Sequence, residues 1–194
     1  MNALPSQLVI VSGPSGAGKS SVLQRLMTRC PLPLRLSVSA TTRSPRPSEK
    51  HGREYYFLSH EEFAEHRDAG EFLECMEVFG RGDWYGTLRN TVDTGLAAGK
   101  WVILEIDVHG MLSVVEQLPS AMTIFLHPSS LAELEKRLRK RGTENEKDLQ
   151  RRLEVARKEL EYLPRYRYQV INDTIDRAVD EICAILLGER ENVG

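Results

Sequence analysis

The stretch LVIVSGPSGAGKS, residues Leu8–Ser20, decides the fold class of this chain. Its apolar start, Leu8–Val11, is typical of a short buried strand, whereas the glycines that follow fit neither a strand nor a helix. From Lys19 onward the apolar residues recur with the helical period. Residues Gly13–Ser20 match the pattern GxxxxGK(S/T) at every defined position. A strand, a glycine loop and a helix in this order predict a loop that binds the phosphates of a nucleotide.

The residue types of this loop suit phosphate chemistry. Glycines let backbone N–H groups turn inward around phosphate oxygens, and the helix that follows directs its positive N-terminal end at the same oxygens. Lys19 is expected to reach the β- and γ-phosphates, and Ser20 to ligate Mg²⁺. The residues expected to bind the ATP phosphates are Gly13, Pro14, Ser15, Gly16, Ala17, Gly18, Lys19, Ser20 and Ser21. The competing interpretation is a glycine turn without a ligand, and the strand before the loop and the amphipathic helix after it argue against that.

A phosphate loop alone does not separate kinases from GTPases or ATPases. GTPases usually carry a base-reading motif of the NKxD type, and the sequence contains none. Large motor ATPases need far more chain than 194 residues. A short chain with this loop near its start therefore indicates a small-molecule kinase.

Composition and charge are those of an ordinary globular domain. Lys plus Arg number 26 and Asp plus Glu 28, and the net charge of −2 gives no bulk attraction to nucleic acid or to an anionic membrane. The three cysteines, Cys30, Cys75 and Cys183, form no CxxC pair, which argues against a disulfide framework or a zinc site. The first residues lack the pattern of a signal peptide, and no apolar run approaches the ~18–20 residues of a membrane span. We expect a cytoplasmic protein whose partners are nucleotides, not nucleic acid or a membrane.

Apolar runs and helical patterns alternate along the rest of the chain. Strands are predicted at about 34–40, 55–58, 72–78, 101–107, 122–126 and 168–171. Helices are predicted at about 59–70, 88–98, 129–141, 147–163 and 174–187, with a loop at about 79–86. Ser59 and Glu62 form an expected capping box at the first of these helices. The alternation predicts an α/β fold, with a parallel sheet flanked by helices on both faces.

The segment Ser39–Pro47, SATTRSPRP, is the second concentration of polar side chains. It places Arg43 and Arg46 around a proline, beside several hydroxyls. Guanidinium groups bind phosphate oxygens through paired hydrogen bonds, and hydroxyls satisfy the oxygens that remain. Tyr55 could add a phenol to such a site. Composition alone leaves two interpretations open, a solvated basic loop and an anion site, and favours the solvated loop.

Several blocks along the chain resemble those of guanylate kinases, in the same order. The blocks are SVSATTRSPR at 37–46, GREYYF at 52–57, GEFLE at 70–74, WYGT at 84–87, IDVHG at 106–110, RLRKRGT at 137–143 and VIND at 170–173. The resemblance implies a single domain, 1–194, with the fold of P-loop nucleoside-monophosphate kinases and a core at about 1–36, 96–135 and 165–194. It also implies a small strand-rich GMP-binding lobe, inserted at about 37–95, and a helical lid at about 136–164.

The same resemblance implies a role for each polar group near the acceptor. The GMP phosphate would be held by Ser39, Arg43, Arg46, Tyr55 and Tyr85. Glu74 would bind guanine, because guanine presents N1–H and an amino group side by side and an ionised carboxylate is acceptor-only. Adenine has a lone pair at N1 instead. Thr87 could donate to guanine O6, and Asp107 would lie at the base or near the metal.

Three further groups complete the site that the resemblance implies. The catalytic cations would be Lys19, Arg43, Arg137, Arg141 and Arg152, the last three folding over the triphosphate as parts of the lid. The metal would be Mg²⁺, held by Ser20 and by Asp107, the latter directly or through water. Glu105, at the end of the same buried strand, is a second carboxylate expected near the metal. Asn172 and Asp173, at the end of the last strand, would lie beside the adenine of ATP.

The expected activity is transfer of the γ-phosphoryl group of MgATP to GMP, and to dGMP, giving ADP and the diphosphate in purine nucleotide metabolism and GMP recycling. The sequence departs from the family pattern in three places. The connection from Glu74 to Tyr85 is slightly longer than usual, Glu105 occupies a position where the family commonly has aspartate, and His109 occupies one where it often has glutamine. Two rivals are a P-loop kinase acting on a ribose phosphate, which should lack Glu74, and a phosphopeptide-binding module, which usually has a degraded phosphate loop.

Overall fold

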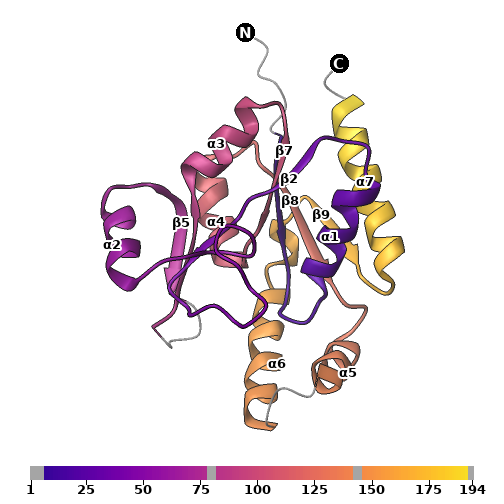
Figure 1. Cartoon of the computed structure of the whole chain (residues 1–194). Coiled ribbons are helices and arrows are strands. Elements are labelled where there is room, and N and C mark those ends of the chain that lie inside the picture. Colours follow the sequence, from indigo (N-terminus) through magenta and orange to yellow (C-terminus); the bar gives the residue numbers. More distant parts are fainter. Residues whose placement is uncertain (1–6, 78–81, 142–145, 192–194) are drawn as a thin grey trace.

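The computed structural model describes residues 7–77, 82–141 and 146–191, and its core is a five-stranded parallel sheet (Figure 1). The strands lie in the order β2-β7-β1-β8-β9. In that order their bounds are Leu34–Leu36, Trp101–Glu105, Leu8–Ser12, Met122–His127 and Tyr168–Ile171. Every neighbouring pair is parallel, so the carboxyl ends of the strands meet at one edge, which is where open α/β sheets bind ligands.

Strand β1 lies at the centre of the sheet, and its alternate residues face two separate apolar clusters. Helices α1 (Lys19–Arg29) and α7 (Ile175–Glu191) cover the first face. Helices α3 (Arg89–Ala97) and α4 (Val108–Gln117) cover the second face. All of β1 is buried, as expected for a strand covered on both sides. The predicted α/β fold, a parallel sheet flanked by helices, is therefore confirmed.

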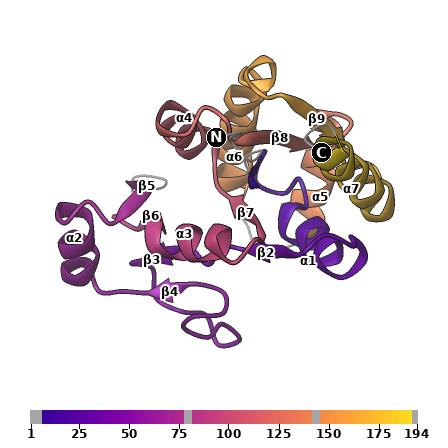
Figure 2. The same ribbon diagram turned by 90° about the horizontal axis from the view of Figure 1, so that it is seen from above.

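A second sheet of four strands forms a lobe beside the core (Figure 2). Its order is β4-β3-β6-β5, with bounds Tyr56–Phe57, Ala40–Thr41, Trp84–Leu88 and Phe72–Glu77. Helix α2 (His60–Asp68) packs on this sheet, and the rings of Phe63 and Phe72 stack with their centroids 4.4 Å apart. Ser59 and Glu62 form the predicted capping box at the start of α2.

Three elements differ from what the sequence predicts. The strand predicted at about 34–40 is two strands, because the chain leaves the core sheet after β2 and enters the sheet of the lobe at β3. The loop predicted at about 79–86 is wrong over its last residues, because β6 begins at Trp84 and pairs antiparallel with β5. Residues 78–81 lie outside the described part of the chain. Helix α4 is missing from the prediction because Gly110 in its first turn weakens the helical pattern. Oδ1 of Asp107 caps this helix by accepting from the Gly110 N–H at 2.8 Å.

Helices α5 (Leu131–Arg141) and α6 (Glu146–Leu160) extend from the carboxyl edge of the sheet, below the core in Figure 1. They pack on each other through an apolar cluster of their own, whose buried members are Leu134, Leu138, Leu149, Leu153 and Ala156. A short 3₁₀ turn, Leu163–Arg165, then leads to β9. The apolar cluster between α5 and α6 is thus separate from the two clusters of the core, although Leu160 at the end of α6 packs on one of them.

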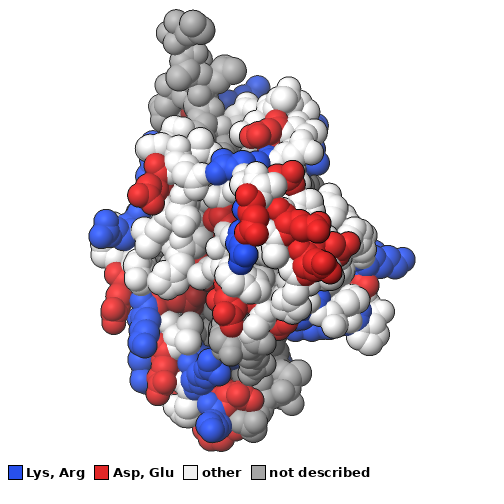
Figure 3. Space-filling view, turned by 90° about the vertical axis from the view of Figure 1, so that its left-hand side faces the viewer, with Lys and Arg blue, Asp and Glu red and all other residues white. Residues whose placement is uncertain are grey.

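Both signs of charge occur on the surface around the lobe, as the face in Figure 3 shows. An anion site on this molecule therefore has to come from a local arrangement of side chains, as the net charge of −2 also requires. In the described ranges, no helix combines the length and the apolar character needed to cross a bilayer.

Candidate active site

The glycine loop, residues 13–20, runs from the end of β1 into α1 and is fixed by two close approaches. Gly13 has a φ of +146°, and a Cβ there would lie 1.9 Å from the backbone O of Leu126 on β8. Gly18 has a φ of +89°, and a Cβ there would lie 2.6 Å from Nδ2 of Asn172. A side chain at either position would collide, so tertiary packing as well as loop conformation requires these glycines.

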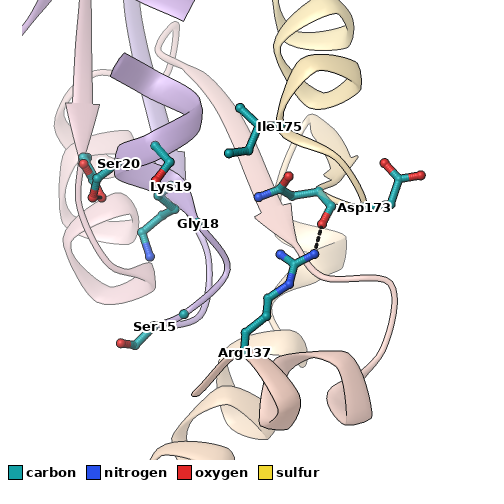
Figure 4. A pocket seen from close by; sticks show the side chains of 11 residues that line it. Ser15, Gly18, Lys19, Ser20, Arg137, Asp173 and Ile175 are labelled. Atoms are coloured by element: carbon teal, nitrogen blue, oxygen red, sulfur yellow. Dashed lines mark hydrogen bonds between the residues drawn. The ribbon is translucent and has the colours of Figure 1, made fainter. Parts of the chain in front are cut away.

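Lys19 begins α1 and turns its side chain back over the glycine loop (Figure 4). Its Nζ donates to the backbone O of Gly13 at 2.5 Å and to that of Pro14 at 3.3 Å. Burial lowers the pKa of Lys19, with Glu105 the strongest of the neighbouring carboxylates that act against this shift. An ammonium has three N–H donors, and the two carbonyls take two of them. The lysine is thus held by the loop itself with a donor left for a ligand.

Ser20, the next residue, lies beside a carboxylate at the end of β7. Its Oγ donates to Oε1 of Glu105 at 2.8 Å. A hydroxyl and a carboxylate are hard oxygen ligands of the kind that Mg²⁺ prefers, so this donor set fits the expected ion. Asp107 is engaged differently, because its Oδ1 caps α4. Of the two strand-end carboxylates that the sequence placed near the metal, the structure thus brings Glu105 to Ser20, whereas Asp107 caps a helix.

Lys19 and Ser20 line a pocket of ≈ 480 Å³ at the carboxyl edge of the core sheet (Figure 4). Its size suits a small-molecule ligand. Its walls come from the glycine loop and α1, the end of β7, α5 and the segment after β9. The lining residues are Ser15, Gly16, Gly18, Lys19, Ser20, Ser21, Glu105, Arg137, Asn172, Asp173 and Ile175.

Asn172 and Asp173 belong to the wall of the pocket that follows β9 (Figure 4). Nδ2 of Asn172 donates to the backbone O of Ala17 at 2.7 Å, while its Oδ1 is buried and has no hydrogen-bond partner. Asp173 pairs with Arg177 at 2.5 Å, on the exposed side. Ile175 is 44% exposed and adds an apolar surface. The Asn172 amide therefore holds the glycine loop, and Ile175 supplies an exposed apolar surface on this wall of the pocket.

Two of the three arginines predicted for the lid reach the walls of this pocket. Arg137 of α5 donates from Nη2 to the backbone O of Asn172 at 2.7 Å (Figure 4). Arg152 of α6 donates from Nη1 to Oγ of Ser15 at 2.9 Å. The side chain of Arg141 lies outside the described part of the chain. Helices α5 and α6 therefore each place a guanidinium at the pocket or its loop.

A second polar cluster lies on the lobe. Nε of Arg43 donates to the Tyr85 hydroxyl at 3.2 Å, and its guanidinium carbon lies 5.5 Å from the ring centroid of Tyr55. The rings of Tyr55 and Tyr85 meet edge to face, with centroids 5.8 Å apart. The antiparallel pairing of β3 with β6 thus brings Tyr85 to Arg43, despite the longer connection between β5 and β6. The other two residues predicted here are Ser39, which is half-buried, and Arg46, which is 74% exposed.

Glu74 of β5 and Thr87 of β6 form a buried pair where the lobe meets α4. The Thr87 hydroxyl donates to Oε1 of Glu74 at 2.7 Å, and a Cβ at Gly110 would lie 3.0 Å from Oε2. Burial raises the pKa of Glu74 to about 7; the Thr87 bond opposes this shift and Asp107 adds to it. Thr87 has one O–H and directs it at Glu74. In this structure it orients the carboxylate, whereas the sequence suggested a contact with guanine O6.

We expect kcat/KM for GMP to fall as the pH drops below about 7, because a protonated Glu74 no longer accepts two hydrogen bonds from guanine. The second pKa of the GMP phosphate, about 6, titrates close by. The control is therefore Glu74→Gln, which leaves the phosphate unchanged and removes the titrating carboxyl. The measurement is the ratio of wild-type to variant kcat/KM from about pH 5.5 to 8.5. A ratio that stays constant over this range would contradict the assignment.

Comparison with known proteins establishes the family of the chain. Residues 5–189 match the family model described as guanylate kinase. Over 190 residues the chain is 58% identical to the guanylate kinase of Rhodopirellula baltica, covering 97% of this chain and 91% of that protein. The chain belongs to the guanylate kinase family. The guanylate kinase of Desulfitobacterium hafniense is 46% identical over 183 residues, covering 94% of this chain and 90% of that protein. The resemblance inferred from the sequence blocks is confirmed.

Solved structures agree with this membership. The guanylate kinase from Anaplasma phagocytophilum has a TM-score of 0.76 and 32% identity, covering 96% of this chain and 88% of that one. A gluconokinase from Sinorhizobium meliloti, at 19% identity and a TM-score of 0.51, shares the fold alone. Guanylate kinases phosphorylate GMP with ATP, and this chain is an enzyme of that family.

Two residues that the structure places in these clusters are missing from the prediction made on the sequence. Glu49 is hydrogen-bonded to Arg43, and a carboxylate three residues after Arg46 in a basic loop could have indicated it. Ile175 lines the pocket of the glycine loop. The sequence carries no signal for Ile175, because exposed single isoleucines are common at helix starts and elsewhere on protein surfaces.

Proposed function

We propose that the chain transfers the γ-phosphoryl group of MgATP to GMP and to dGMP, in the cytoplasm and as part of purine nucleotide metabolism and GMP recycling. The observation that carries the acceptor assignment is the buried Glu74, 9% exposed and oriented by Thr87, on the same lobe as the Arg43 cluster. A carboxylate accepts from two adjacent donors, and guanine offers N1–H and its amino group side by side. The Arg43 cluster supplies the cation and phenols that a phosphate needs.

The glycine loop is proposed to hold the phosphates of ATP through its backbone N–H groups, with Lys19 at the β- and γ-phosphates. When bound, Mg²⁺ neutralises part of the charge on the transferred group, and Ser20 together with Glu105 would hold it. Asn172, Asp173 and Ile175 would border the adenine. The support for this arrangement is that all these residues, and Arg137, line one pocket.

The reaction follows from these placements. An oxygen of the GMP phosphate attacks the γ-phosphorus in line, a new P–O bond forms, and the bond from that phosphorus to the β,γ-bridging oxygen breaks to release ADP. The GMP phosphate is mostly ionised near pH 7, because its second pKa is about 6, so the attack needs no protein base. Lys19, Arg43 and the lid arginines Arg137, Arg141 and Arg152 stabilise the charge that spreads over the transferred group. Closure of α5 and α6 would exclude water from it.

Each of the two rival functions would leave certain residues of this chain without a role. A kinase for a ribose phosphate has no need of a buried carboxylate, and Glu74 is present and oriented. A phosphopeptide-binding module has no need of Lys19 or of the Ser20–Glu105 pair, and both are present. These residues support the kinase with GMP as acceptor over both alternatives.

The proposal predicts the acceptor preference of the purified protein. With MgATP as donor, ADP formation is expected with GMP and dGMP. The kcat/KM is expected to be at least about 100-fold lower with AMP, CMP or UMP, because none of these bases offers Glu74 two adjacent donors. Chelation of the metal by EDTA should abolish turnover, and added Mg²⁺ should restore it. Equal turnover of GMP and AMP would overturn the role of Glu74, and ATP binding without turnover of any monophosphate would favour the binding module.

A further inference from the structure

Glu49 lies in the loop between β3 and β4, and its carboxylate is held on several sides. Its two oxygens accept from Nη2 of Arg43 at 3.0 and 2.9 Å. Oε2 also accepts from the backbone N–H of Arg46 at 2.8 Å, while the N–H of Glu49 donates to the backbone O of Arg46 at 3.0 Å. The side chain of Glu49 is 12% exposed. The reciprocal bonds with Arg46 close a turn, so the carboxylate is fixed by its own backbone.

Arg43 is correspondingly restrained on all three nitrogens of its guanidinium. Nε donates to the Tyr85 hydroxyl at 3.2 Å, Nη1 to the backbone O of Ser44 at 2.7 Å and Nη2 to Glu49. The group also lies over the rings of Tyr55 and Phe57, 5.5 and 5.7 Å from their centroids. An arginine side chain has many rotamers, and phosphate recognition through its planar fork requires one of them.

The electrostatics of the pair agree with a persistent contact. Burial acts to raise the pKa of the Glu49 carboxyl, but hydrogen bonds from the Arg46 N–H and the Arg43 guanidinium outweigh it and lower that pKa. The carboxylate therefore stays ionised at neutral pH. Two roles are open to an anion in this place. It could fill the phosphate position until GMP displaces it, or it could hold Arg43 from behind while the phosphate binds at another edge of the guanidinium.

The turn decides between these roles. To leave Arg43, the Glu49 carboxylate would also have to break its bond to the Arg46 N–H. The Nε edge of Arg43, in contrast, faces the hydroxyl of Tyr85, beside Tyr55. We propose that Glu49 is a positioning residue for the acceptor phosphate, which fixes the Arg43 guanidinium so that its Nε side and the two tyrosines receive the phosphate. This inference rests on the proposed role of Arg43 in binding GMP.

The test compares GMP with guanosine, which carries the same base and no phosphate. Glu49→Gln keeps a similar side-chain volume but replaces one acceptor oxygen with an NH₂ donor. This NH₂ would face the Arg46 N–H or the Arg43 guanidinium, so at least one hydrogen bond to Glu49 is lost. We expect the KM for GMP to rise by about 10- to 100-fold, the size typical of losing a residue that orients a binding group. The inhibition constant of guanosine, measured against GMP, should change by less than about twofold, because the base site is untouched. Glu49→Ala should show the same split.

The matched control is Glu54→Gln. Glu54 lies in the same loop and also accepts from a backbone N–H, that of Lys50, and from a guanidinium, that of Arg53, both at 2.7 Å. The described bonds of Glu54 do not include Arg43, so its KM for GMP should stay at the wild-type value. The melting temperature of each variant separates loss of folding from loss of phosphate binding.

Three results would overturn the inference. A lower KM for GMP in Glu49→Gln would mean that the carboxylate competes with the phosphate. An unchanged KM with a lowered melting temperature would mean that Glu49 only stabilises its loop. If the wild-type protein binds GMP no more tightly than guanosine, the Arg43 cluster does not bind the acceptor phosphate, and the proposed function of this cluster is wrong. The first two results would leave that function intact.

Discussion

Lys19→Ala is expected to lower kcat by about 10³-fold, with a smaller effect on the binding of ATP, because an ammonium at the transferred phosphoryl group stabilises charge that grows in the transition state. The structure places Nζ of Lys19 against the backbone of Gly13 and Pro14, over the glycine loop and inside the proposed ATP pocket. The measurement is steady-state turnover with saturating MgATP and GMP, together with the Kd of ATP for each protein.

Because Lys19 also bonds to its own loop, the alanine variant could change the loop as well as the charge. Lys19→Met retains the length of the side chain and removes only the ammonium, so it should lose as much activity. Lys136→Ala, which removes a lysine 80% exposed on α5, is the control and should keep wild-type turnover. A Lys19→Met enzyme within about tenfold of the wild type would show that the lysine is not part of the catalytic machinery.

Glu74→Gln is expected to lower kcat/KM for GMP by at least about 10²-fold, and to reduce the preference for GMP over AMP by a similar factor. The glutamine amide keeps one acceptor and turns a donor toward guanine, so one of the two base contacts is kept and the other becomes an unfavourable approach of two donors. The Thr87 hydroxyl, which bonds to Oε1, can still orient the side chain, so the fold should be retained. The measurement is kcat/KM with GMP and with AMP for both proteins.

Glu77→Gln provides the control for this result, because Glu77 lies on the same strand, is exposed and bonds to the backbone N–H of Gly82. It should keep the wild-type preference for GMP. A Glu74→Gln enzyme that rejects AMP as strongly as the wild type does would mean that guanine is recognised by other groups. The search would then turn to the segment around Asp107 and α4.

The sequence identified those features whose physics is contained in a short stretch of chain. The strand Tyr168–Ile171 has the predicted bounds, and the capping box of Ser59 and Glu62 forms as predicted. The capping box depends only on residues three positions apart. The bounds of the strand could be predicted from its own apolar pattern, although the strand forms by pairing with β8. The strand–loop–helix order around Gly13–Ser20 likewise needed no tertiary information, because β1 ends at Ser12 and α1 begins at Lys19.

The sequence could not locate features made by long-range contacts. Strand β6 (Trp84–Leu88) has a glycine and turn-like surroundings, and only its pairing with β5 makes it a strand. The same pairing brings Thr87 beside Glu74, and through β3 it places Tyr85 near Arg43. The positions of β7 and α4 determine which of the two acidic residues contacts Ser20. Glu105, the last residue of β7, bonds to Ser20, whereas Asp107 caps α4.

The sequence by itself therefore determined the fold class, the family and the chemical types available for phosphate and guanine. The tertiary structure decided which of these groups touch: Glu105 with Ser20, Thr87 with Glu74 and Glu49 with Arg43. The physical reason is that helix periodicity, caps and glycine loops are set by neighbouring residues. A hydrogen bond between residues 85 positions apart, as between Ser20 and Glu105, exists only when strands and helices have packed into one register.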